Sequence, residues 1–199
     1  MLRHVAIAAF LASLIPVAAV AQAAPQPSHS GAGLAPVVER RDAAIFKDVA
    51  KQVVSYNRFT VFDDVQASVA EGVVTLYGEV TMPYKREDLA RRAGNVPGVR
   101  QVVNKIAVLP VSQFDDDLRY QIARAIYGSP SFWHYASMAN PPIHIVVQNG
   151  HVTLTGVVNN EVEKVLARSL ANGFNAFSVD CQLKTDAEAR ADMEKVESK

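Results

Sequence analysis

The chain has 199 residues, of which 49% are hydrophobic and 20% are charged, and its formal net charge at pH 7 is +0. This balance is ordinary for a soluble protein of one or two small domains, and it excludes an overall bias toward nucleic acid or another polyanion. Cys181 is the only cysteine, so an intramolecular disulfide is excluded, and no cysteine stands where a lipoprotein would be acylated.

The amino terminus is typical of a secretory signal peptide. Arg3 precedes an apolar run, Val5 to Val20, that ends in the small residues AVAQAA. We predict a signal peptide over residues 1–23, cleaved at an A-x-A motif, and export of the remaining chain to the periplasm. An uncleaved membrane anchor is the alternative, which the shortness of the run disfavours. Residues 24–39 are rich in Pro, Ser and Gly and are predicted to form a flexible leader.

An amphipathic helix is predicted next, because apolar residues recur at helical spacing at Ile45, Val49 and Val53. Apolar residues with a period of two then lead into EGVVTLYGEV, residues 71–80, and this pattern predicts a β-hairpin. A second helix follows, with Leu89 on its inner face, and the strand VRQVVNKIAVL ends the segment. The predicted order of elements is therefore α-β-β-α-β.

The same order recurs, so the chain is a duplication. Residues 149–158, NGHVTLTGVV, repeat the hairpin 78 positions later, whereas the first helix repeats at an offset of 73. The difference of five residues is an insertion within SPSFWHYASMANPP, residues 129–142. In the second copy, the second helix is predicted over about residues 160–172 and the last strand over residues 177–183.

The second hairpin allows its register to be predicted. Asn149-Gly150 suits a two-residue type I′ turn, which needs positive φ at both positions, and Val147 then faces Val152. Five apolar residues share the inner face: Ile143, Ile145, Val147, Val152 and Leu154. Five polar residues share the outer face, which is predicted to be solvated: His144, Gln148, His151, Thr153 and Thr155. The glycines of the two hairpin motifs are expected to be structural: Gly72, Gly78, Gly150 and Gly156.

The predicted fold class is α+β, with two α-β-β-α-β domains in tandem, each a three-stranded mixed sheet with two helices on one face. We place the domains at residues 40–109 and 114–185. Residues 186–199 form a charged tail, predicted to be a frayed helix or disordered. The apolar residues expected on the inner face of the second helix in the second domain are Val162, Leu166 and Leu170.

Both copies resemble the BON domain, which is named for bacterial OsmY and nodulation proteins. The resemblance rests on the order of elements and on the hairpin motif G-x-V-T-L-x-G-x-V, at Gly72 to Val80 and Gly150 to Val158. It rests also on the sequence GVRQVVNKI, from Gly98 to Ile106. The second copy departs from the pattern after its second helix. The resemblance implies an OsmY-like periplasmic protein linked to osmotic or envelope stress, with phospholipid-binding or chaperone-like contacts and no catalysis.

The usual signatures of catalysis are missing, since the sequence has no P-loop, no G-x-S-x-G, no H-E-x-x-H and no paired cysteines. We therefore predict a protein that is not an enzyme and that uses no cofactor. His144 and His151 share the outer sheet face, but their register separates them by roughly 13 Å at about 3.3 Å per residue, so no shared metal ion is predicted. Cys181 is expected to point into the second core as a small hydrophobe.

Two sets of residues are candidates for contact with a partner. The insertion gathers three aromatic residues of the kind found at membrane interfaces and in partner anchors, unless they complete the second core: Phe132, Trp133 and Tyr135. The second helix of the first domain carries four basic residues suited to anionic lipid headgroups: Lys85, Arg86, Arg91 and Arg92. Because Glu87 and Asp88 interrupt them, the alternative is a solvated face of mixed charge.

The predicted function is that of an exported, non-catalytic binding module of the cell envelope. Its expected partners are anionic phospholipid, bound peripherally, or exported and outer-membrane proteins, and the export signal disfavours nucleic acid. One alternative is a periplasmic protein that binds a small ligand or a cation. Another is a structural subunit that assembles through exposed sheet edges. The oligomeric state is left open.

Overall fold

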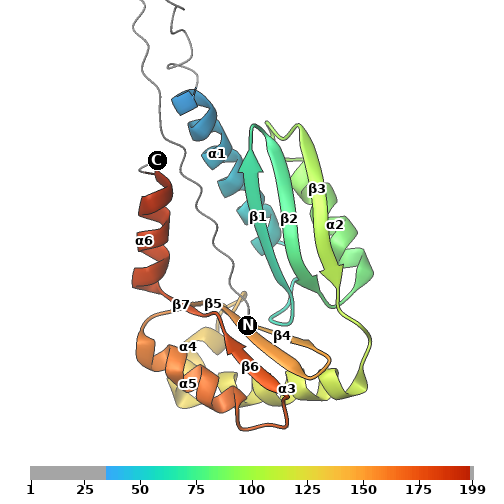
Figure 1. Cartoon of the computed structure of the whole chain (residues 1–199), viewed down its shortest axis with the longest axis vertical. Coiled ribbons are helices and arrows are strands. Elements are labelled where there is room, and N and C mark those ends of the chain that lie inside the picture. Colours follow the sequence, from blue (N-terminus) through green and yellow to red (C-terminus); the bar gives the residue numbers. More distant parts are fainter. Residues whose placement is uncertain (1–34, 198–199) are drawn as a thin grey trace, which may run out of the picture. The chain divides into compact units, whose positions relative to one another are not determined.

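The structure is a computed structural model and describes residues 35–197 (Figure 1). The predicted signal peptide, residues 1–23, and most of the predicted leader lie outside the described residues. The first helix, α1 (Ala35–Val54), begins before the predicted domain boundary at residue 40 and takes up the end of the leader. Within the described part of the chain, no helix is long and apolar enough to cross a membrane.

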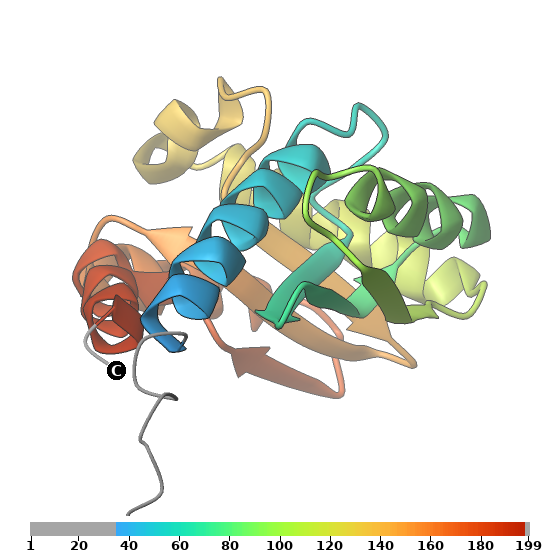
Figure 2. The same cartoon turned by 90° about the horizontal axis from the view of Figure 1, so that it is seen from above.

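The first copy has the predicted sheet with two helices on one face. Its elements are α1, β1 (Asp64–Ala70), β2 (Val73–Val80), α2 (Pro83–Gly94) and β3 (Gln101–Val108). β1 pairs with β2 in antiparallel orientation and β2 pairs with β3 in parallel orientation, so the sheet order is β1-β2-β3. α1 packs on β1, α2 packs on β3, and the two helices lie side by side (Figures 1 and 2).

The second copy repeats this arrangement with an interrupted third strand. Its elements are α3 (Gln113–Tyr127), a 3₁₀ turn (Pro130–Phe132), α4 (Trp133–Ala136), β4 (Ile143–Gln148), β5 (His151–Val158), α5 (Glu161–Ala171), β6 (Ser178–Cys181) and β7 (Lys184–Thr185). A single strand was predicted over residues 177–183. Instead β6 and β7 both pair with β5 in parallel orientation, because the chain turns between them to bury Leu183 in the core.

The predicted charged tail is helical over most of its length, as α6 (Asp186–Glu197). Its start is stabilised by two reciprocal hydrogen bonds. The Glu188 backbone N–H donates to Thr185 Oγ1 (3.2 Å), and the Thr185 N–H donates to a Glu188 carboxylate oxygen (2.7 Å). This capping box satisfies two N–H groups at the helix start, which explains a helix in a segment without a broad apolar face.

Each copy has its own hydrophobic core between the sheet and the helices. Ile45, Val49 and Val53 on α1 are buried as predicted, together with Leu89 on α2. In the second copy the predicted pairing of Val147 with Val152 is present, and all five residues of the predicted inner face are buried.

The prediction for the inner face of α5 is partly wrong. Val162 is 76% exposed, whereas Ala167 and Ala171 are fully buried and Leu166 and Leu170 are partly buried. The helix is therefore rotated from the predicted orientation. Two alanines on the buried face allow the helix to approach the sheet closely, which a face of larger side chains would prevent.

Both hairpin tips have the backbone conformation that a type I′ turn requires. Glu71 and Gly72 have φ angles of 51° and 76°, and Asn149 and Gly150 have φ angles of 52° and 77°. The near identity of these angles confirms that Glu71-Gly72 makes the same turn as the more favourable pair Asn149-Gly150.

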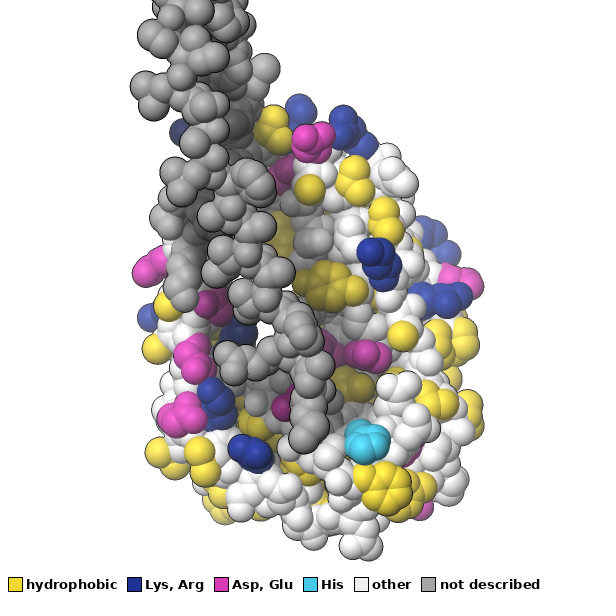
Figure 3. Space-filling view, viewed as in Figure 1, with side chains coloured by type: hydrophobic (Ala, Val, Ile, Leu, Met, Phe, Trp, Pro, Cys, Tyr) yellow, Lys and Arg dark blue, Asp and Glu magenta, His cyan; other side chains and the backbone are white. Residues whose placement is uncertain are grey.

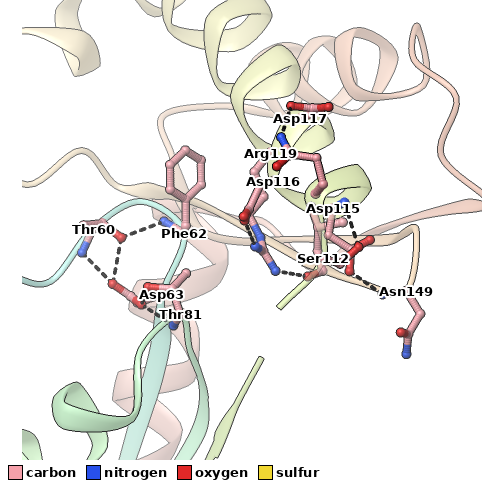
Figure 4. Close-up of polar contacts among 12 residues, drawn as sticks. Thr60, Phe62, Asp63, Thr81, Ser112, Asp115, Asp116, Asp117, Arg119 and Asn149 are labelled. Atoms are coloured by element: carbon pink, nitrogen blue, oxygen red, sulfur yellow. Dashed lines mark hydrogen bonds and ion pairs between the residues drawn. The ribbon is translucent and has the colours of Figure 1, made fainter. Parts of the chain in front are cut away.

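A carboxylate at an equivalent position holds each hairpin tip. Asp42 on α1 accepts hydrogen bonds from the two N–H groups of the first tip, at 2.6 and 2.9 Å. Asp115 on α3, which is 73 residues further along, accepts from the two N–H groups of the second tip at 2.9 and 2.7 Å (Figure 4). The first helix of each copy therefore fixes the end of its own hairpin.

Candidate partner-binding site

The insertion places only one of its three aromatic side chains at the surface. Phe132 and Tyr135 are buried in the second core, with exposed fractions of 0% and 4%, whereas Trp133 is 72% exposed. The prediction that Phe132 and Tyr135 contact a partner is therefore wrong, because both side chains complete the second core. Trp133 stays a candidate.

Tyr135 also has a structural role through its hydroxyl group. The hydroxyl accepts a hydrogen bond from the Asn159 N–H (2.9 Å) and donates one to the Glu163 carboxylate (2.7 Å). Burial and then the hydrogen bond to Glu163 raise the pKa of Tyr135 to about 12. The insertion therefore delivers a hydrogen-bonding group to the point where β5 leads into α5.

The first copy holds the same point with a buried ion pair. Asp63 accepts a hydrogen bond from the Thr81 N–H (2.8 Å), which corresponds to the Asn159 N–H of the second copy (Figure 4). Lys85 Nζ lies 2.6 Å from the Asp63 carboxylate, and the two side chains are 4% and 0% exposed. Burial alone would raise the pKa of Asp63, but the hydrogen bonds from Lys85, Thr81 and Thr60 outweigh it and lower the pKa.

The prediction that Lys85 belongs to a lipid-facing cluster is therefore wrong. Its ammonium group is buried against Asp63 and donates a second hydrogen bond to Thr81 Oγ1 (2.8 Å). An ammonium group that is buried against its counter-charge cannot reach a headgroup at the surface.

The other three predicted basic residues are accessible on α2. Arg86 and Arg91 are exposed, and Arg92 is half-buried with its guanidinium 5.0 Å from the centre of the Tyr56 ring. Arg58, from the loop before β1, lies 5.3 Å from the centre of the Tyr84 ring. We call Arg58, Arg86, Arg91 and Arg92 the α2 basic surface. Lys and Arg side chains gather beside α2 and β3 in the space-filling view (Figure 3).

Asp88, an acidic residue that lies beside the α2 basic surface, is already paired. Asp88 forms an ion pair with Arg91 and accepts a hydrogen bond from the Tyr56 hydroxyl (2.7 Å). That hydrogen bond, followed by the charge of Arg91, lowers the pKa of Asp88. The second copy has no such surface, because Lys164, Ser169 and Leu170 occupy the positions of Arg86, Arg91 and Arg92 at an offset of 78.

The outer face of the second sheet is not fully solvated, contrary to prediction. His144 is largely buried beside the Phe59 ring (5.4 Å between ring centres), and the Ile145 N–H donates to the Val61 carbonyl (2.7 Å). The loop before β1 thus covers the edge strand β4. Burial lowers the pKa of His144 and outweighs the nearby charge of Asp64. His151 is exposed, as predicted.

Four polar residues that hold the fold were missed at the sequence level. Arg119 is 4% exposed, donates to the Val147 carbonyl (2.5 Å) and pairs with Asp116 (Figure 4). The other three are Asp42, Asp63 and Asp115. The constant offset of 73 aligns Asp42 with Asp115 and would have identified this pair, whereas no local pattern marks Asp63 or Arg119.

Among residues 35–197, no group of three or more His, Cys, Asp or Glu side chains is placed to hold a metal ion. Cys181 is half-buried and packs against the second core, with its thiol 4.0 Å from the Lys164 carbonyl. Most of these buried polar side chains form hydrogen bonds with backbone N–H or carbonyl groups. They stabilise the two modules and leave the exposed residues as the candidates for binding.

The described residues form two α-β-β-α-β modules in tandem, each with its own sheet and core. The chain belongs to the BON domain family, whose model matches residues 41–110 and 115–185. The family is in general non-enzymatic, and membership supports a binding module of the envelope type.

Comparison with other proteins adds two solved structures. The chain is similar to CdsD, described as a structural protein of the type III secretion system of Chlamydia trachomatis. The identity is 14%, the match covers 76% of this chain and 97% of that chain, and the TM-score is 0.27. A second match is the C-terminal domain of CdsD, with 17% identity, 71% of this chain and 65% of that chain covered, and a TM-score of 0.29. No curated protein matches the chain.

Proposed function

We propose that this chain is an exported, non-catalytic periplasmic protein that binds anionic phospholipid peripherally through the α2 basic surface. The observation that supports this proposal is the local excess of guanidinium groups on one side of the first copy. Asp63 is engaged by buried Lys85, and Asp88 by Arg91 and Tyr56. Among residues 35–197, Arg58, Arg86 and Arg92 form no ion pair, although Asp88 interacts electrostatically with Arg58 and Glu87 is exposed next to Arg86.

The chemistry of this surface suits a phosphate-bearing headgroup. A guanidinium presents paired N–H donors that match phosphate oxygens, and it binds them more specifically than an ammonium does. Met82 and Tyr84, at the start of α2, are 49% and 44% exposed and supply apolar and aromatic surface beside the arginines. Aromatic side chains of this kind favour the headgroup region of a bilayer.

Trp133 favours a second candidate function, which is contact with an exported protein in the manner of a chaperone. It is 72% exposed, and Met138 in the same insertion is 47% exposed. Residues 129–142 contain no Lys or Arg, so Trp133 and Met138 suit an unfolded apolar segment better than an anionic headgroup.

Vesicle flotation tests the proposal. We expect the protein to float with vesicles of phosphatidylglycerol and to stay in the dense fraction with phosphatidylcholine. Each basic residue near an anionic surface contributes about 1 kcal/mol, so the double variant Arg58→Gln/Arg86→Gln, which removes two arginines outside the Asp88–Arg91 ion pair, should bind roughly 30-fold more weakly. The matched control, Arg124→Gln/Arg168→Gln, removes two exposed charges from the second copy and should bind as the wild type does.

Equal loss of binding in both double variants would show that net charge, and not the α2 basic surface, governs flotation. If neither vesicle binds, the phospholipid proposal is wrong. A blue shift of Trp133 fluorescence on addition of an unfolded outer-membrane protein, but not of vesicles, would support the second candidate instead.

A further inference from the structure

The hairpin end of the second copy carries an exposed pair of phenyl rings. Phe114, at the start of α3, and Phe177, just before β6, stack with 6.0 Å between ring centres, and they are 47% and 74% exposed. His151 lies edge-on to Phe177 at 5.9 Å. The space-filling view shows hydrophobic side chains beside a histidine at this end of the second sheet (Figure 3). Neither phenylalanine is part of the second core.

The backbone places both rings at defined positions. The Phe177 N–H donates to the Gly150 carbonyl (2.8 Å), and Phe114 directly precedes Asp115, whose carboxylate holds the hairpin tip. Phe114 and Phe177 are therefore held next to each other by the same interactions that hold the tip. An exposed aromatic pair fixed in this way is a preformed contact surface.

The first copy has the same backbone arrangement at its hairpin end but carries charged side chains where the second copy carries phenyl rings. The Arg100 N–H donates to the Gly72 carbonyl (2.8 Å), as Phe177 does to Gly150, and Arg41 directly precedes Asp42. Two exposed arginines thus occupy the positions of the two phenylalanines.

The residues next to the two hairpin ends also differ in charge, with more positive charge in the first copy and more negative charge in the second. Arg40 of the first copy corresponds to Gln113, at an offset of 73. Asp116 and Asp117 of the second copy correspond to two alanines in the first, Ala43 and Ala44 (Figure 4). One hairpin end is therefore rich in arginine, although Arg100 lies 3.8 Å from the exposed Glu71 carboxylate of its own tip, and the other end is aromatic and acidic.

We infer that the occupant of the aromatic hairpin end is the cationic hairpin end of a second copy of this chain. Guanidinium groups bind favourably over aromatic faces and pair with carboxylates, so Arg41 and Arg100 match the stacked rings and the adjacent Asp117. The two ends of one chain differ, so the contact is head-to-tail. Each copy offers one end to each of two neighbours, which generates a ring or an open chain.

Sedimentation velocity of the purified protein in low salt tests the inference. We expect concentration-dependent association at about 0.1 mM, since a contact of this size is below that of a standard stable interface. Phe114→Ser/Phe177→Ser and Arg41→Glu/Arg100→Glu should each be monomeric. Each variant keeps one intact end, so an equimolar mixture should form a heterodimer that cannot extend.

The control Val165→Ser changes an exposed apolar residue on α5 and should associate as the wild type does. Raising the salt from 50 to 500 mM should weaken association of the wild type at least about tenfold, because exposed charge pairs are screened. Far-UV circular dichroism verifies folding. If the serine variant does not fold, the glutamate variant and the salt dependence carry the test.

Three results would overturn the inference. The first is a wild type that stays monomeric up to 1 mM. The second is association that survives in both double variants, which would assign it to another surface. The third is a mixture of the two variants that stays monomeric. Loss of vesicle binding in Phe114→Ser/Phe177→Ser, without any self-association of the wild type, would identify the aromatic end as a membrane contact instead.

Discussion

Replacing Lys85 with Met distinguishes a structural lysine from a lipid-binding one. The side chain is almost fully buried, and its ammonium group forms an ion pair with Asp63, at 2.6 Å. Methionine has a similar shape, so the substitution removes the charge without opening a large cavity. The Asp63 carboxylate would then remain buried without its counter-charge.

The expected cost follows from this loss of pairing. Breaking a buried ion pair by removing one partner costs about 3–5 kcal/mol. Asp63 keeps four other hydrogen bonds, two from Thr60 and two from Thr81, so we expect the lower end, about 3 kcal/mol. For a domain of about 70 residues, such a loss lowers the melting temperature by about 12–24 °C.

Urea unfolding followed by far-UV circular dichroism measures this change. The control Arg86→Gln alters the adjacent exposed residue and should change stability by less than about 0.5 kcal/mol. Asp63→Asn/Lys85→Met should be more stable than Lys85→Met alone, since it removes the unpaired charge. A Lys85→Met variant with unchanged stability and weakened vesicle binding would refute the assignment of Lys85 to the fold.

Three further predictions concern the braces of the fold. Asp115→Ala should cost about 3 kcal/mol and Asp42→Ala about half as much in urea unfolding, because Asp115 is fully buried and Asp42 is partly solvated; equal costs would contradict this. Tyr135→Phe should cost about 0.5–1.5 kcal/mol, because it removes the two hydrogen bonds of the hydroxyl while the Asn159 N–H keeps the Glu163 carboxylate as an acceptor (3.0 Å), and a neutral effect would show that water replaces the hydroxyl. The pKa of His144 in the folded protein lies below its ordinary value of 6.5, so as the pH falls the unfolded chain takes up this proton before the folded protein does. Stability from neutral His144 is therefore complete above pH 6.5 and is lost as the pH falls toward the folded pKa. His144→Gln should flatten this part of the pH profile, whereas the exposed control His151→Gln should leave it as in the wild type.

The features predicted correctly are those that depend on short-range patterns. The alternation of apolar residues determined which face of the second hairpin is buried. The dipeptide Asn149-Gly150 determined the turn, and the turn set the pairing of Val147 with Val152. These rules act over a few residues and need no knowledge of the tertiary structure.

The wrong assignments of site residues depend on partners that are distant in the sequence. Lys85 lies among exposed charged residues on α2 and is buried only because Asp63, 22 residues earlier, lies opposite it. His144 follows the polar pattern of an outer sheet face but is covered by a loop of the first copy, through Phe59 and Val61. No period along the chain reports such long-range pairings.

The duplication makes it possible to separate fold from function, because the same backbone site can be compared in two copies. Where β2 or β5 leads into a helix, one N–H group needs an acceptor, supplied by the Asp63 carboxylate in the first copy and by the Tyr135 hydroxyl together with the Glu163 carboxylate in the second. The helix partner then changes from Lys85 to Glu163, since a carboxylate needs a cation whereas a hydroxyl needs an acceptor. A difference between copies that satisfies the same backbone group is therefore structural, however different the two residues are chemically. The change from Arg100 to Phe177 satisfies no such group, because the backbone hydrogen bond is the same in both copies. A difference of that kind alters only what the surface presents, and it is there that binding by this protein should be sought.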